Sequence, residues 1–242
     1  TAVSFSSSVA GTTYTWTAAP SGAGITGYTA SGSASIPVQT INSTLNTPGT
    51  VTYTITPSFS GCTGTSTAHI VTIQPIPSVT NASMSQIICN GGNSSPVNLL
   101  SNVAGTSFTW TAIPSSAAIT GYQASGGNTI PAQMIFNSGT TPGTVTYQII
   151  PTSNFGPACP GIQANYTITV NPTPIITSSL VSDICSGQPF NYTITSNIAG
   201  SSFTWSRAAV SGISNAPGTG TSANINETLH NTTNFDIDVT YV

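Results

Sequence analysis

Apolar and polar residues alternate with a period of two through much of the chain. The alternation is clearest in residues 106–113 (TSFTWTAI), where Phe108 and Trp110 alternate with serine and threonine, and it recurs in residues 143–150 and 163–170. Successive side chains of a strand point to opposite faces, so this pattern predicts half-buried β-strands. Further strands of the same stretch are expected at residues 84–89, 96–101 and 130–136.

Turn signals separate these segments, and no stretch repeats its apolar residues with the 3.6-residue period of a helix. Glycine or proline stands at residues 126–127, 142–143 and 157, between the expected strands. Short alternating strands joined by such turns are typical of an all-β sandwich. The pattern therefore predicts an all-β fold.

A long internal repeat sets the domain organisation. The stretch VAGTSFTW at 103–110 recurs as VAGTTYTW at 9–16 and IAGSSFTW at 198–205, so the tryptophans stand 94 (110 − 16) and 95 (205 − 110) residues apart. A period of this length suits one small domain and predicts a tandem array. The expected repeats are residues 1–76, without a first strand, residues 77–173, which are complete, and residues 174–242, without a last strand.

The expected connections between repeats are short and rich in proline. QPIP at 74–77 and NPTP at 171–174 follow the last strand of their repeats. Prolines at alternate positions favour extended, semi-rigid backbone. We therefore expect a stiff string of domains.

Charged residues make up only 2% of the chain, against about 25% in an average domain. Apolar residues make up 38% and net charge is low, so the composition is that of folded domains with neutral, hydroxyl-rich surfaces. One arginine cannot neutralise the phosphates of a nucleic acid or attract an anionic membrane. Nucleic-acid binding is therefore not expected. Direct membrane insertion is not expected either, because no run of 18 apolar residues occurs.

Four cysteines keep step with the repeat. Cys89 and Cys185 lie in matching contexts 96 residues apart (185 − 89), and Cys62 and Cys159 lie 97 apart (159 − 62). One early and one late cysteine per repeat predict a disulfide between Cys89 and Cys159 and an oxidising, extracellular compartment. Cys62 and Cys185 are expected to pair with cysteines outside this sequence. The alternative is four buried free thiols.

Several motifs taken together resemble a known family. They are YTWTAAPSGAGITG at 14–27, PGTVTYTITP at 48–57, the GC(T/P)G segments, NPTP at 171–174 and ICSG at 184–187. The chain resembles, three times over, the PKD-like repeats of giant cell-surface proteins of gliding Bacteroidetes. The resemblance implies immunoglobulin-like β-sandwiches of about seven strands, type IX secretion, and a role in adhesion or gliding motility.

The resemblance brings no catalytic residue, and the acidic WDFGDG-like run of better-known PKD domains is absent, since Trp110 is followed by TAIP. His69 and His230 fall at unrelated repeat positions without clustered ligands, so neither metal nor cofactor is expected. Asp236 and Asp238 could suggest the paired carboxylates of a glycosidase, but a solvated strand face is the expected interpretation. The carboxylates all lie in the third repeat: Asp183, Glu227, Asp236 and Asp238.

Two groups of aromatic residues are candidates for ligand contact. One comprises Trp16, Trp110 and Trp205, each two residues after Tyr14, Phe108 or Phe203 on the same strand face. Core packing is the expectation for these tryptophans, and a carbohydrate-stacking platform is the alternative. Tyr28 and Tyr122, in the ITGY motifs, fall in expected loops and are candidate surface ligand contacts.

The sequence thus predicts a non-enzymatic, extracellular, cell-surface repeat region that acts as a stalk or adhesive fibre. Its expected partners are a polysaccharide or abiotic surface, or neighbouring repeats of the same polypeptide. Two alternatives stay open. One is a subunit of a self-assembling extracellular filament. The other is a carbohydrate-binding accessory region of a secreted hydrolase.

Overall fold

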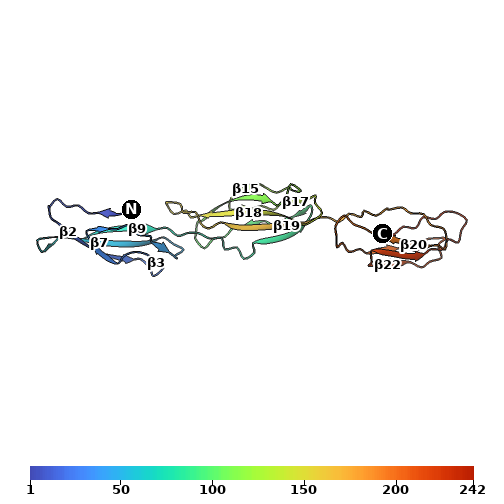
Figure 1. Ribbon diagram of the computed structural model, residues 1–242, viewed down its shortest axis with the longest axis horizontal. Coiled ribbons are helices and arrows are strands. Elements are labelled where there is room, and N and C mark those ends of the chain that lie inside the picture. Colours follow the sequence, from blue (N-terminus) through green and yellow to red (C-terminus); the bar gives the residue numbers. More distant parts are fainter.

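The computed structural model describes residues 1–242 and consists of β-strands and loops. Three β-sheet units lie end to end in one elongated row (Figure 1). We call them unit 1 (residues 1–76), unit 2 (77–173) and unit 3 (174–242). The all-β, immunoglobulin-like architecture predicted from the alternation and the resemblance is confirmed. No helix of the fold is long and apolar enough to cross a membrane.

Unit 2 is the complete sandwich, and its larger sheet has five strands in the order β10-β19-β18-β13-β15. Strand β10 runs parallel to β19, and every other pair in this sheet is antiparallel. The strands are β10 (Ser85–Cys89), β13 (Ser107–Pro114), β15 (Ser125–Gly126), β18 (Gly143–Thr152) and β19 (Ala164–Asn171).

The opposite layer of unit 2 is made of shorter strands. It contains the order β11-β17-β14 and the separate pair β12-β16. The expected strand over 130–136 is interrupted because Pro131 has no N–H for a ladder and the Gln133 N–H donates instead to Ser94 Oγ at 3.0 Å. The strands are β11 (Gly92–Asn93), β12 (Val97–Asn98), β14 (Ile119–Thr120), β16 (Thr129–Ile130) and β17 (Met134–Asn137).

The core of unit 2 forms around the central strand β18. Val145, Tyr147 and Ile149 alternate along it and are fully buried, as the period-two pattern requires. The Trp110 ring meets the Tyr147 ring edge to face, with centroids 5.2 Å apart, a favoured aromatic geometry. Twelve buried residues make one continuous cluster, so unit 2 has a core of its own.

Unit 1 repeats this architecture with one strand fewer. Trp16 pairs with Ile55 between β2 and β7, as Trp110 pairs with Ile149 in unit 2. Strand β9 pairs only with β7, so the edge that β10 covers in unit 2 is open in unit 1. The strands are β1 (Val3–Ser4), β2 (Thr13–Pro20), β3 (Ile25–Thr26), β4 (Ser31–Ser33), β5 (Ser35–Ile36), β6 (Asn42–Ser43), β7 (Gly49–Phe59), β8 (Cys62–Thr63) and β9 (Thr67–Ile73).

Unit 3 has the fewest strands. It has two antiparallel pairs, β20-β23 and β21-β22, and a bridge between Arg207 of β21 and Tyr241 joins the second pair to the chain end. Trp205 is consequently half-buried, whereas Trp16 and Trp110 are 3% and 2% exposed. The strands are β20 (Pro189–Thr193), β21 (Trp205–Arg207), β22 (Gly218–Gly220) and β23 (Asn224–Thr228).

Direct contacts hold units 1 and 2 together at their junction. Gln74 Nε2 donates to the Gly156 carbonyl at 3.0 Å, and Asn102 Nδ2 donates to Asn46 Oδ1 at 2.9 Å. A Cβ added at Gly161 would lie 1.9 Å from the Pro77 carbonyl oxygen, so the linker packs closely on unit 2. The junction is therefore restrained by more than its prolines.

Candidate functional site

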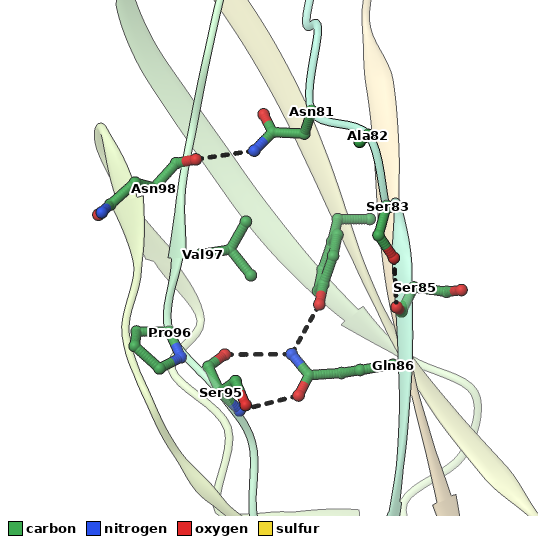
Figure 2. A pocket seen from close by; sticks show the side chains of 10 residues that line it. Asn81, Ala82, Ser83, Ser85, Gln86, Ser95, Pro96, Val97 and Asn98 are labelled. Atoms are coloured by element: carbon green, nitrogen blue, oxygen red, sulfur yellow. Dashed lines mark hydrogen bonds between the residues drawn. The ribbon is translucent and has the colours of Figure 1, made fainter.

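An open groove lined by several polar residues lies on the surface of unit 2. It has a volume of about 400 Å³ and lies between the chain leading into β10 and the segment around β12 (Figure 2). Tyr166 of β19 also lines it. Figure 2 shows Asn81 and Gln86 reaching across the groove toward Asn98 and Ser95.

Gln86 is the central side chain of the groove. Its Nε2 donates to the Tyr166 hydroxyl at 2.6 Å and to the Ser95 carbonyl at 3.1 Å, while its Oε1 accepts from the Ser95 N–H at 2.8 Å. Burial raises the pKa of Tyr166, and the Gln86 hydrogen bond offsets this in part. The phenol therefore stays protonated and neutral at physiological pH.

Asn81 forms the second bridge across the groove. Its Nδ2 donates to the Asn98 carbonyl at 2.7 Å, and its Oδ1 accepts from the Leu100 N–H at 2.9 Å. The groove thus presents amides, hydroxyls and backbone groups, with no ionisable carboxylate, imidazole or thiol in its lining. These groups suit hydrogen bonding to a neutral ligand such as a sugar, and they supply no acid, base or nucleophile of suitable pKa.

A tyrosine and an amide or carboxylate form a second recurring feature, once in each unit. The Tyr53 hydroxyl donates to Gln39 at 3.0 Å, and the Tyr147 hydroxyl donates to Gln133 at 3.2 Å. Tyr241 donates in the same way to the Glu227 carboxylate of unit 3 at 2.6 Å. Burial raises the pKa of Tyr147 to about 12.

Unit 3 replaces that amide with Glu227 and adds the only arginine of the chain beside it. Arg207 Nε donates to Glu227 Oε2 at 2.8 Å, and the Tyr241 hydroxyl donates to the same oxygen at 2.6 Å. Arg207 is 3% exposed and follows Trp205 by two residues, where units 1 and 2 have Ala18 and Ala112. The buried guanidinium and the half-buried carboxylate are therefore a matched pair of replacements.

The pKa values in unit 3 follow from this pairing. Burial acts to raise the pKa of Glu227, but the hydrogen bonds from Arg207 and Tyr241 outweigh it, so the pKa lies below its ordinary value. The Glu227 hydrogen bond raises the pKa of Arg207. Burial and then the Glu227 hydrogen bond raise the pKa of Tyr241. The triad therefore serves as a neutral structural cluster, since each member is held in its ordinary charge state.

The other candidate groups remain scattered. No three His, Cys, Asp or Glu side chains come together in a way that could hold a metal ion. His69 lies against Tyr53, with ring centroids 6.5 Å apart. Asp236 and Asp238 are exposed and lie outside any strand, so the pair is solvated as expected but not on a strand face.

The predicted aromatic residues differ in their surroundings. Trp16 and Trp110 are buried, and their indole N–H groups donate to the Ser35 and Thr129 carbonyls at 3.0 and 3.2 Å. The expectation of a core position does not fully hold for Trp205, whose Nε1 has no partner, because unit 3 lacks the long central ladder. The candidate ligand contacts Tyr28 and Tyr122 are half-buried and pack against the cores of their units.

The predicted disulfide between Cys89 and Cys159 does not form, and all four cysteines are free thiols. Cys89 pairs in register with Asn171 at one end of β19. Cys159 precedes the other end, where its carbonyl accepts from the Ser153 N–H. The eight residues of β19 span about 25 Å, whereas a disulfide requires Cα atoms within about 7 Å. Sequence spacing alone could not show that the two cysteines lie at opposite ends of the sandwich.

The groove and the tyrosine pairs were not predicted from the sequence. A signal for the pairs was present, because Gln39, Gln133 and Glu227 each stand 14 residues before a repeated tyrosine. The groove has no such periodic signal. Its central residue Gln86 lies three residues before Cys89, and the matching position before Cys185 is Ser182.

The fold and its sites define a class of protein: a tandem array of immunoglobulin-like β-sandwiches whose buried polar clusters are structural. The family model of the PKD-like domain matches residues 2–77, 86–174 and 182–242. The chain therefore belongs to the PKD-like domain family. No curated protein matches it. Domains of this family are usually extracellular and are typically non-catalytic.

Proposed function

We propose that this chain is a segment of an extracellular stalk or adhesive fibre belonging to a large cell-surface adhesin. The observation that carries the proposal is the row of three units (Figure 1), in which hydrogen bonds hold the first junction. Such a row favours a fixed spacing between its ends, because both linkers are short and rich in proline and the first one packs on unit 2. No chemistry is required of a part that spaces or presents contacts.

The composition of the surface supports weak contact with neutral material. Only five residues of the chain are charged, and two of them, Arg207 and Glu227, neutralise each other inside unit 3. A polysaccharide or an inert abiotic surface is therefore the expected partner, bound through hydroxyls, amides and exposed apolar side chains. Repetition of such contacts along a stalk multiplies retention through effective concentration. Within this proposal, the resemblance favours type IX secretion and a role in attachment or gliding.

Retention of coated beads tests the proposal. Beads carrying the 242-residue chain are placed on polysaccharide films and on glass, and detachment under flow is measured at about 0.05 M and about 1 M salt. Retention that is nearly independent of salt is expected, because few charges take part. Beads coated with a highly charged globular protein are the control. Retention equal to that of uncoated beads, or retention lost at high salt, contradicts the proposal.

A self-assembling filament is a second candidate, and the open edge of β9 favours it. In unit 2 the corresponding edge is covered by the parallel strand β10, so a strand from another copy could occupy the edge in unit 1. Light scattering over a wide concentration range separates the two candidates. A molar mass equal to that of one chain at every concentration contradicts the filament candidate. A molar mass that increases with concentration supports it.

The third candidate, a carbohydrate-binding accessory region, is favoured by the neutral groove around Gln86. Binding of soluble oligosaccharides followed by the chemical shifts of the Gln86 and Asn81 side-chain amides tests it. Shifts confined to these groups would support a discrete site. Bead retention without any such shift would mean that adhesion does not use the groove and that the adhesive contacts are distributed along the stalk.

A further inference from the structure

Cys89 and Cys159 lie at opposite ends of unit 2, where this unit faces its two neighbours. Cys89 ends β10 beside Asn171, immediately before the linker to unit 3. The next residue, Asn90, donates through its Nδ2 to Thr173 Oγ1 within that linker at 3.2 Å. The early cysteine of a unit therefore lies at the end that faces the following unit.

The late cysteine lies at the opposite end. Cys159 belongs to the loop between β18 and β19, and this loop contacts unit 1 through the hydrogen bond from Gln74 to the Gly156 carbonyl. The loop is held firmly, because Ser153 donates its N–H to the Cys159 carbonyl at 3.0 Å and accepts the Cys159 N–H on its Oγ at 3.2 Å. Ser153 itself is 1% exposed.

The repeat brings these two positions together across a junction. Asn171, the neighbour of Cys89, corresponds to Gln74 in unit 1, because Ala164 and Thr67 occupy the same place opposite Ile149 and Ile55. The counterpart of Cys89 in a complete preceding unit would thus stand beside Gln74, the residue that contacts the Cys159 loop.

We propose that disulfides in this protein join successive units, with the early cysteine of one unit bonded to the late cysteine of the next. The inference rests on the proposed function, in which complete units follow one another. It gives Cys159 a partner in the preceding unit and Cys89 a partner in the following one. Unit 1 as described has no strand beside Gln74 and unit 3 has no late cysteine, which accounts for four free thiols in this chain.

The bond forms by thiol–disulfide exchange with the disulfide of an oxidoreductase. One thiolate attacks the oxidant to give a mixed disulfide, and the second thiolate displaces the oxidant as its dithiol. The two cysteines lose two protons and two electrons, and the oxidant gains them. The resulting staple lies beside the proline linker, so a pulling force would pass through two covalent connections at each junction.

A chain with a duplicated unit tests the inference. A second copy of residues 78–174 is inserted after Pro174, which gives a full-length chain with six cysteines (four plus the two in the copy). After oxidation in a glutathione redox buffer, alkylation is expected to label four thiols. Peptide mapping is expected to find one disulfide, which joins a Cys89 peptide to a Cys159 peptide. The unmodified chain is expected to label at all four cysteines.

Matched variants show which copy of the unit supplies Cys89 to the disulfide. Cys89→Ser in the first copy is expected to abolish the disulfide, and Cys89→Ser in the second copy is expected to leave it intact. Six labelled thiols, or a bond between Cys89 and Cys159 of the same copy, would overturn the inference. Neither result affects the bead assay, so loss of the staple with retained adhesion would leave the stalk proposal standing.

Discussion

Gly126 lies so close to the Trp110 indole that a Cβ atom on the glycine would be 2.2 Å from Cζ2 of the ring. The same relationship joins Gly32 to Trp16, at 2.4 Å, and Gly220 to Trp205, at 2.6 Å. The three glycines stand 94 residues apart (126 − 32 and 220 − 126). Each repeat therefore keeps a glycine where the neighbouring strand must cross the tryptophan ring.

Gly126→Ala should destabilise unit 2, because the added methyl group has no space beside Trp110. We expect a loss of about 1–3 kcal/mol, as for other overpacked cores. Denaturant unfolding, with hydrogen exchange of the β13 and β18 amides to localise the effect, measures it. Gly127→Ala is the matched control, since a Cβ there meets only the Phe108 carbonyl oxygen at 3.6 Å. Equal stability of the two variants would contradict the prediction.

Trp110→Ala should cost unit 2 roughly 3–5 kcal/mol, because it empties the centre of the core. Trp205→Ala should cost unit 3 less, since that ring is half-buried. Hydrogen exchange in each unit, measured in the intact chain, gives the two losses separately. A loss below about 1 kcal/mol for Trp110→Ala would favour the carbohydrate-platform interpretation of the ring instead.

Arg207→Ala should destabilise unit 3 by about 3 kcal/mol, because it leaves the Glu227 carboxylate without its buried partner. The double variant Arg207→Ala, Glu227→Gln restores the neutral residues that units 1 and 2 carry at these places, and we expect it to recover most of the loss. A double-mutant cycle on unfolding free energies measures the coupling. Additive effects would show that the two side chains do not depend on each other.

Acidification should loosen unit 3 before the other units. The folded-state pKa of Glu227 lies below its ordinary value of 4.5, so its stabilising contribution is complete above pH 4.5 and is lost as the pH falls through the folded-state pKa. Units 1 and 2 carry Gln39 and Gln133 at this place and lack that dependence. As the pH is lowered from roughly neutral into the acid range, hydrogen exchange should therefore change most in unit 3. In Glu227→Gln the difference between units should shrink.

Gln86→Ala should destabilise unit 2 by about 1–3 kcal/mol, because it leaves the Tyr166 hydroxyl and the Ser95 backbone groups without their partner. Gln163→Ala is the control, since Gln163 is exposed and its side chain hydrogen-bonds only to the Asn165 side chain. Thermal unfolding of both variants compares them. An unchanged midpoint for Gln86→Ala would mean that water replaces the amide in the groove.

The periodic residues account for most of what could be predicted. Val145, Tyr147 and Ile149 alternate in the sequence and are all fully buried, because a strand places every second side chain on the same face. The strand expected over 130–136 was only partly correct, since Pro131 interrupts the ladder and the backbone turns to Ser94. The groove around Gln86 could not be predicted, because it depends on two segments that meet only after the sheets have packed.

The sequence by itself determined the number of units, their all-β class and the buried places of Trp16 and Trp110, because local alternation and a long repeat are properties of the chain alone. Only the tertiary structure decided which polar residues meet. Arg207 and Glu227 are 20 residues apart in sequence and form an ion pair inside unit 3. Cys89 and Cys159 belong to one unit and are held apart by the length of β19. The physical reason is that strand register and direction, which set these distances, are fixed by the pairing of the whole sheet.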